Sequence, residues 1–142
     1  MNIQIIKHGS ENYQKMVVLR TEILRKPLGL AYTEAQLSAE QSDILIGAFE
    51  NEAIKGCCIL SPAKNTEMQL RQMAVATSQQ GQGVGSAIIQ FAEQYAIENG
   101  YTSMMLHARK TALEFYQKLG YQAFGDEYFE VGLAHFSMRK LL

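Results

Sequence analysis

The sequence predicts an α+β (α/β) fold, with a central twisted sheet of about seven strands, mixed but mostly antiparallel, and about four flanking helices. The length of 142 residues suits one domain, so residues 1–142 are treated as a single unit. The hydrophobic share of 47% is ordinary for a chain with a real core. Hydrophobic periodicity gives the order β-α-α-β-β-β-α-β-α-β-β, in which hairpins precede one crossover helix between strands.

The N-terminal part begins with a strand over residues 3–7. Ser10 is a favourable N-cap, and apolar residues at mixed three- and four-residue steps predict a helix from there to about Arg25. Pro27 is expected to stop this helix, because the residue before a proline avoids helical geometry. A second, short helix is expected over residues 34–41.

The remaining elements follow from strand runs, turn residues and one long amphipathic stripe. Glycines after the two later helices are typical of helix ends. A hairpin is expected where Glu50-Asn51-Glu52 separates two strand-like runs. The expected strands cover 44–49, 53–60, 67–76, 102–108, 121–124 and 136–141, and the expected helices cover 83–99 and 111–119.

A glycine-rich segment, Gln80-Gly81-Gln82-Gly83-Val84-Gly85, connects the strand over 67–76 to the helix over 83–99. The first N–H groups of a helix have no partner inside the helix, and the helix dipole adds positive charge there. Glycine lets a ligand approach the backbone closely. The segment is therefore suited to hold a phosphate group, although glycines also make a simple tight connection.

Two familiar nucleotide loops do not fit this segment. A P-loop needs a lysine after its second glycine, and no lysine is present. A dinucleotide fingerprint needs a third glycine where this chain has Ser86, and a clear acidic residue at the end of the next strand is missing. What remains is the pattern Gln-x-x-Gly-x-Gly, formed by Gln80, Gly83 and Gly85.

This pattern resembles the acyl-CoA loop of the GNAT superfamily of N-acetyltransferases. The segment from Ala112 to Tyr121, with Phe115-Tyr116 and Leu119-Gly120 inside it, is similar to the second signature of that family. The ending Phe129-Glu130-Val131-Gly132-Leu133-Ala134-His135 resembles that of small bacterial GNAT proteins of the ElaA and YjcF type, with Ala134 in place of a proline. The resemblance covers nearly the whole chain.

The resemblance implies that acetyl-CoA is the co-substrate. The backbones of Met73 and Val75 would bind the pantetheine arm, the loop would hold the pyrophosphate, and the sheet would open beside the preceding strand. Arg109 replaces a usual asparagine, and with Lys110 it either meets a CoA phosphate or forms a solvated turn. The implied cofactor-binding residues are Met73, Ala74, Val75, Gln80, Gly81, Gln82, Gly83, Val84, Gly85, Ser86, Arg109, Ala112, Phe115 and Tyr116.

Three residues are candidates for catalysis. Tyr116 matches a tyrosine that protonates the departing thiolate in this family, since a phenol stays protonated at neutral pH; the alternative is a core aromatic. Gln69 stands where some members carry a glutamate base, and glutamine cannot take a proton. Glu130 and His135 are the alternative candidates for the base. The non-catalytic alternative is that Glu130 is a surface residue and that His135 has a structural role.

Composition limits the other function classes. A net charge of −1 without a basic run argues against nucleic acid as the main partner, and no apolar stretch is long enough to span a membrane. Cys57 and Cys58 are adjacent on a strand and poorly placed to bridge each other. The three histidines show no ligand spacing, so no metal is expected. Reduced thiols and the lack of a secretory signal favour a cytoplasmic protein.

The sequence therefore predicts an acyl-CoA-dependent N-acyltransferase, with acetyl transferred from acetyl-CoA to a primary amine by direct attack. The alternative is a non-catalytic acyl-CoA-binding sensor. The acceptor amine is left open, and Arg20 and Arg25 either line its pocket or face solvent. A homodimer through the C-terminal strands is a further possibility.

Overall fold

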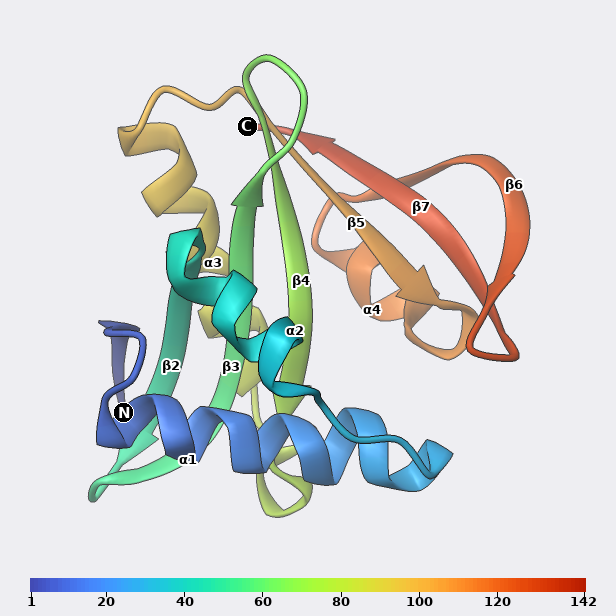
Figure 1. Cartoon of the computed structure of the whole chain (residues 1–142). Coiled ribbons are helices and arrows are strands. Elements are labelled where there is room, and N and C mark those ends of the chain that lie inside the picture. The colour runs from blue at the N-terminus through green and yellow to red at the C-terminus, as the bar shows by residue number, and fades with distance from the viewer.

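The computed structural model describes residues 1–142 and contains one seven-stranded sheet in the order β1-β2-β3-β4-β5-β7-β6 (Figure 1). All neighbouring strands pair antiparallel except β4 and β5. The predicted fold class is confirmed. The strands are β1 Asn2–Ile6, β2 Ile44–Glu50, β3 Ala53–Pro62, β4 Glu67–Val75, β5 Ser103–Arg109, β6 Gln122–Glu130 and β7 Leu133–Leu141.

Four α-helices cover the two faces of this sheet. Helices α1 (Glu11–Arg20) and α2 (Glu34–Ala39) lie in front of β2–β4 in Figure 1, and α3 (Val84–Glu98) lies behind them. The short helix α4 (Leu113–Lys118) covers the β5–β7 part on the same face as α3. None of these helices is long and apolar enough to cross a bilayer.

Each face of the sheet has its own core. Cys58 belongs to the core under α3 and α4, whereas its neighbour Cys57 belongs to the core under α1. This confirms that the two thiols point to opposite faces, and both are free. Alternation along β3 thus supplies side chains to both layers, as expected for a strand buried on both sides.

The first helical segment differs from the prediction. The α-helix ends at Arg20 and continues as a π-helical turn over Thr21–Arg25 and a 3-10 turn over Lys26–Leu28. Pro27 does not stop it, because proline fits the first positions of a helical turn, where its missing N–H is not needed. Gly29, with φ of 70°, ends the segment.

The last two strands are longer than predicted. Residues 125–130 and 133–135, expected to connect them, extend β6 and β7 into a hairpin whose turn is Val131-Gly132. Both turn residues have positive φ, as a tight turn between twisted strands requires. The hairpin has no clear sequence signal, because β6 is an exposed edge strand. A bulge between Phe124 and Tyr128 also interrupts the alternation of side chains between the two faces of the sheet.

Strands β4 and β5 separate after a short parallel ladder. They pair only over residues 67–70 and 103–106, and beyond Leu70 and Leu106 they diverge (Figure 1). Within the diverging part of β4, Gln72 has φ of 53° and marks a bulge against β3. The splay that the family resemblance implied is therefore present.

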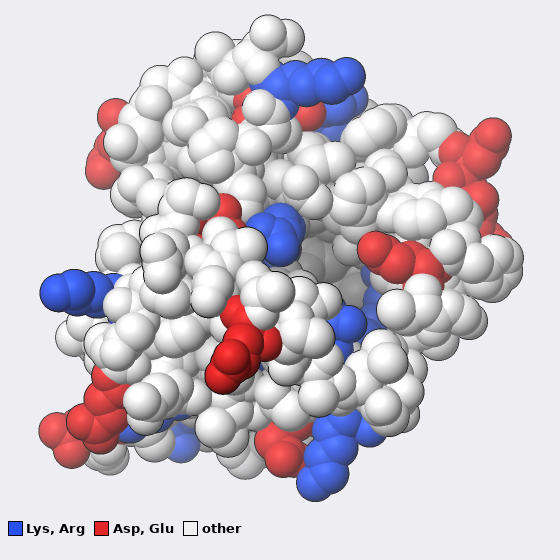
Figure 2. All heavy atoms as spheres, viewed as in Figure 1, with Lys and Arg blue, Asp and Glu red and all other residues white.

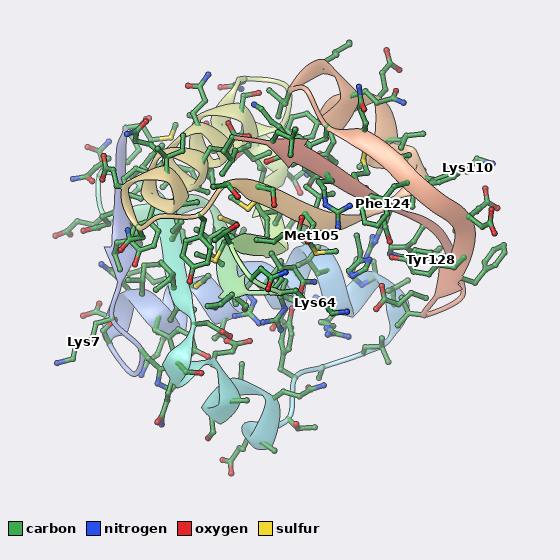
Figure 3. All side chains as sticks on the ribbon, turned by 90° about the horizontal axis from the view of Figure 1, so that it is seen from above. Lys7, Lys64, Met105, Lys110, Phe124 and Tyr128 are labelled. Atoms are coloured by element: carbon green, nitrogen blue, oxygen red, sulfur yellow. The ribbon has the colours of Figure 1, made fainter.

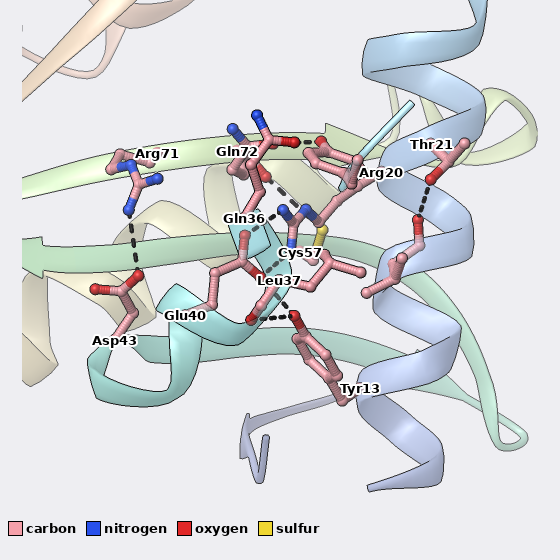
Figure 4. Close-up of polar contacts among 12 residues, drawn as sticks. Tyr13, Arg20, Thr21, Gln36, Leu37, Glu40, Asp43, Cys57, Arg71 and Gln72 are labelled. Carbon is pink, nitrogen blue, oxygen red and sulfur yellow. Dashed lines mark hydrogen bonds and ion pairs between the residues drawn. The ribbon is translucent and has the colours of Figure 1, made fainter. Parts of the chain in front are cut away.

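A buried ion pair fastens α1 to the segment after α2 (Figure 4). Arg20 is fully buried, and its Nη1 and Nη2 donate to the Oε1 and Oε2 of Glu40 over 2.8 and 2.6 Å. The Tyr13 hydroxyl donates to the same carboxylate over 2.7 Å. Arg20 therefore neither faces solvent nor lines a pocket, which corrects both roles considered for it. A fixed bidentate pair of this kind requires both partners, because either charge alone would be buried uncompensated.

We predict that Glu40→Gln lowers the free energy of unfolding at pH 7 by about 3–5 kcal/mol, the usual cost of breaking a buried pair. Burial alone would raise the pKa of Glu40, but hydrogen bonds from Arg20 and Tyr13 outweigh it and hold that pKa below its ordinary value. The stabilisation is therefore complete above the unfolded pKa of about 4.3 and is lost as the pH falls through the folded pKa.

Urea unfolding at pH 7 and at several pH values below 4.3 measures both effects. The acid-induced loss of stability should be shallower in Glu40→Gln than in the parent. The control is Glu114→Gln, because Glu114 pairs with Lys118 at 3.5 Å on an exposed helix surface and should contribute little. Equal effects of the two substitutions would contradict the role of the buried pair.

Candidate functional site

A cavity of about 260 Å³ lies where β4 and β5 separate. The space-filling view shows the molecule hollowed there, with Lys and Arg atoms on the walls of the hollow (Figure 2). The cavity is bounded by both strands, by the turns that follow α1 and β5, by α4 and by the β6–β7 hairpin. Its lining consists of residues 24–25, 28, 70–73, 106–109, 112, 116, 130–131 and 135.

The exposed edge of β4 presents free backbone groups to this gap. The N–H of Ala76 donates to the Lys55 carbonyl on β3 over 2.9 Å. Because successive residues of a strand direct their polar groups to opposite sides, those of Val75 point away from β3, and those of Met73 do likewise. Ala74 lies between them, opposite Cys57. The edge can therefore receive an extended ligand as an additional strand.

The glycine-rich loop leads from β4 into α3 with an open backbone. Gly81 and Gly83 have φ of 80° and 83°, and a Cβ at either position would meet no atom within 4 Å. Gly83 is the N-cap of α3 and provides no side-chain cap, so the first N–H groups, those of Val84, Gly85 and Ser86, lack a side-chain acceptor. This geometry fits an anion at the helix N-terminus.

The two glutamines of the loop stabilise its shape. The Gln80 amide donates to the Val75 carbonyl over 3.1 Å, and the Gln82 amide donates to the Ser78 carbonyl over 3.1 Å. Gln80 thereby ties the loop to the end of β4. Neither amide projects into the cavity lining.

The start of α3 packs closely against α4. A Cβ on Gly85 would lie 3.1 Å from Cζ of Phe115, so a larger residue would displace that ring. Phe115 remains about one-third exposed beside the helix start. Ala112, just before α4, lines the cavity. The second sequence motif thus faces the glycine-rich loop across this contact.

Tyr116 is buried on α4 and lines the cavity. Its ring packs between those of Phe115 and Tyr121, with centroid distances of 5.0 and 5.9 Å. Burial raises the pKa of the Tyr116 hydroxyl above its ordinary value of about 10. The hydroxyl therefore keeps its proton at neutral pH and can donate it. The structure gives this residue both a core position and access to the cavity.

The β6–β7 hairpin brings Glu130 and His135 to the opposite wall. Buried His135 donates from Nδ1 to the Leu133 carbonyl over 2.8 Å, because a carbonyl can only accept. This leaves Nε2 directed at the Glu130 carboxylate, 3.6 Å from Oε2. The ring of Tyr128 stacks on His135 with a centroid distance of 5.8 Å. Figure 3 shows Tyr128 and Phe124 along the same part of the sheet.

The basic residues near the site separate into two groups. Arg109 extends from β5 across the gap, where its Nη2 donates to the Leu24 carbonyl over 3.5 Å, and both Arg109 and Arg25 line the cavity. Lys110 instead forms an ion pair with Glu127 at 3.4 Å. Gln69, on the paired part of β4, is absent from the lining.

Several lining residues had no sequence signal. Gln72 lies in the β4 bulge and Arg71 precedes it, and the left-handed conformation of Gln72 is one that sequence rules assign to glycine. His107 lines the cavity from β5, and its Nδ1 contacts the Tyr128 hydroxyl. Only the splay and the hairpin, both long-range features, bring these residues to the site.

Together, the splayed strands, the open loop at a helix N-terminus and the facing second motif define the fold of the GNAT class. The model of the acetyltransferase (GNAT) domain family matches residues 11–142, and the chain belongs to this family.

Two Bacillus subtilis proteins are similar over part of their length. YyaT is 36% identical over 72 residues, 51% of this chain and 49% of YyaT, and YjcF is 32% identical over 73 residues, 51% and 52% of the two chains. The chain thus matches about half the length of these curated relatives.

Solved structures with low sequence identity share the complete fold. A Lactobacillus plantarum protein regarded as an N-acetyltransferase superposes with a TM-score of 0.87 at 20% identity, over 100% of this chain and 99% of its own. Escherichia coli ElaA gives 0.82 at 17% identity, over 98% of each chain. A GNAT acetyltransferase of Elizabethkingia anophelis with acetyl-CoA bound gives 0.76 at 19% identity, over 99% and 97%. Similarity to the ElaA and YjcF group is thereby confirmed.

We predict that neither cysteine reacts in the native protein. Burial raises the pKa of the Cys57 thiol to about 12 and that of Cys58 well above its usual range, so little thiolate forms at pH 8. Iodoacetamide followed by mass spectrometry should find both thiols unmodified in buffer and both modified in urea. Modification of either thiol in the folded chain, on the timescale seen in urea, would show the burial to be incomplete.

Proposed function

We propose that this protein transfers an acetyl group from acetyl-CoA to a primary amine by direct attack, without a covalent enzyme intermediate. One arrangement supports the proposal. An open glycine-rich loop and the edge of β4 that is not paired with β5 lead to a single cavity. A protonated tyrosine, Tyr116, lines one wall of this cavity, and the Glu130–His135 pair lines the other. The bound acetyl-CoA of the Elizabethkingia anophelis relative supports the choice of co-substrate.

The residues present fit a CoA molecule. The N–H groups from Gly81 to Ser86 would hold the pyrophosphate, in the open space around Gly81 and Gly83. The backbone of Met73 and the N–H of Val75, whose carbonyl already accepts from the Gln80 amide, would bind the pantetheine arm as an added strand, with Ala74 between them. Ala112 and Phe115 would bound the arm on its other side, and Arg109 would lie near its reactive end. Gln80 and Gln82 would act by fixing the loop.

The chemistry is divided between the two walls of the cavity. Acetyl-CoA supplies the thioester. The acceptor nitrogen attacks its carbonyl carbon, so that a C–N bond forms and the C–S bond breaks. The Val75 N–H polarises the carbonyl oxygen. Nε2 of His135 takes the proton released from nitrogen while Glu130 stabilises the resulting imidazolium, and Tyr116 gives its proton to the departing sulfur before solvent restores it.

Positioning contributes much of the expected rate enhancement. Direct transfer needs the two reactants aligned, and such alignment lowers a barrier by several kcal/mol or more. A buried thiol relay is not required, since Cys57 and Cys58 lie in the cores rather than the cavity. A non-catalytic sensor would bind acetyl-CoA and release no thiol with any amine, so turnover separates the two functions.

We predict that acetyl-CoA raises the melting temperature of the parent protein and that Gly83→Asp abolishes this shift. A carboxylate at the N-cap would occupy the anion position and repel a phosphate. At a hundredfold excess over its Kd, a ligand that binds only the folded state stabilises by about 2.7 kcal/mol. The matched control is Gly9→Asp, because Gly9 has φ of 80° in similarly open space but lies in the β1–α1 turn. A normal acetyl-CoA shift in Gly83→Asp would place the pyrophosphate elsewhere.

We also predict that Tyr116→Phe lowers kcat by about 10²- to 10⁴-fold, the usual contribution of a positioned general acid, with little change in acetyl-CoA affinity. Thiol release monitored with a disulfide dye measures kcat, and thermal shift measures affinity. Tyr121→Phe serves as the control, because Tyr121 is buried beside Tyr116 but is absent from the cavity lining. An unchanged kcat in Tyr116→Phe would assign protonation of the sulfur to water or another group.

A further inference from the structure

Two guanidinium groups in the cavity have no carboxylate partner. Arg25 and Arg109 line it, and neither takes part in an ion pair. The third lining arginine, Arg71, is neutralised by Asp43 at 3.2 Å. Glu130 is the one carboxylate of the lining, and it faces His135. The positive charge is therefore local, since the whole chain carries a net charge of −1.

The side chain of Arg25 is held in place. Its guanidinium lies over the ring of Tyr32, 4.6 Å from the centroid, and buried Arg20 lies 4.5 Å from the same centroid. The Tyr32 hydroxyl in turn donates to the amide oxygen of Gln72 at the β4 bulge. Stacking on a fixed aromatic ring leaves the edge of a guanidinium free for hydrogen bonds. Arg25 is thus oriented by aromatic contact rather than by an anion of the protein.

Arg109 reaches the same side of the cavity from β5. Its one hydrogen bond, from Nη2 to the carbonyl of Leu24, places it beside the residue that precedes Arg25. A guanidinium carries five N–H donors, so most donors of Arg109 are unused. The π-helical turn and the end of β5 therefore bring two underused cations together, and the β5–β7 ladder pairs Arg109 directly with His135.

We infer that the acceptor is an amine that also carries a carboxylate, such as an amino acid, and that Arg25 and Arg109 bind this carboxylate. The inference rests on the proposed function and deepens it. A guanidinium fork matches a carboxylate in a bidentate manner. With the carboxylate held on this side, the amino group is presented to Glu130 and His135. An acceptor with only positive charges, such as a polyamine or an aminoglycoside, would meet two uncompensated cations and is selected against.

The test compares matched acceptors in the thiol-release assay. The standard L-amino acids are each assayed beside their C-terminal amides, with spermidine and an aminoglycoside as cationic probes. The expected result is a preference in kcat/KM of about tenfold or more for at least one free acid over its amide, as expected from charge-assisted hydrogen bonds. Equal or higher rates with amides or polycations would overturn the inference while leaving the transferase function standing.

Substitution of Arg25 assigns the preference to the cavity. Arg25→Gln should raise KM for the preferred acid about tenfold or more while leaving the rate with its amide unchanged, and Arg25→Glu should reverse the preference. The control is Lys26→Gln, because Lys26 is the neighbouring cation, pairs with exposed Glu22 at 3.6 Å and is absent from the lining. A preference that survives both Arg25 substitutions in folded protein would refute the role of this arginine.

The same experiment distinguishes failure of the underlying function. If acetyl-CoA shifts the melting temperature but no amine of either class releases thiol, the transferase proposal itself fails and the inference falls with it. If amides or spermidine release thiol and free acids do not, only the acceptor class is wrong. Arg109→Gln provides a second variant, and loss of discrimination without loss of the acetyl-CoA thermal shift would support its place at the acceptor.

Discussion

The structure depends on the interruption of hydrogen bonding between β4 and β5. Four pairs of residues join these parallel strands, and after Leu70 and Leu106 the backbones separate. Unpaired backbone groups are costly when buried, so the separation is stable only if the groups meet solvent or a ligand. The edge of β4 is therefore both an interruption in the sheet and a candidate binding surface. The cavity lies in this separation, and the candidate proton-transfer groups line it.

The sequence predicted well those elements whose signals are local. The strand–loop–helix from β4 into α3 has a clear amphipathic stripe and glycines that require positive φ, and the crossover into β5 follows from it. The extended part of β6 gives no clear sequence signal, because an exposed edge strand needs no apolar alternation, and the part of β7 that pairs with it is missed for lack of a recognised partner. Pro27 was overestimated as a stop signal, since sequence rules do not distinguish an α-helix from the 3-10 turn in which it lies.

The site was predictable where motifs carry it and unpredictable where tertiary contacts do. Tyr116, Glu130 and His135 come from three different elements, yet all three line one cavity. A shared catalytic site requires this proximity. Their chemical roles stay proposals. The burial of Arg20 could not be read from α1, because its partner Glu40 follows a different helix and no local pattern links them. Arg25, five residues later, is the last residue of the π-helical turn and lines the cavity.

The splay also divides the chain into two consecutive parts. Strands β1–β4 with α1–α3 form one, strands β5–β7 with α4 form the other, and the backbone passes between them once, after α3. The first part contains the open loop, the strand edge and Arg25; the second contains Tyr116, Glu130, His135 and Arg109. Neither part holds all the candidate residues, so the candidate site lies at the interface between the two parts. The candidate site is therefore complete only when the two parts are packed together, and a substitution in one part can change its contribution to the cavity without changing the fold of the other part.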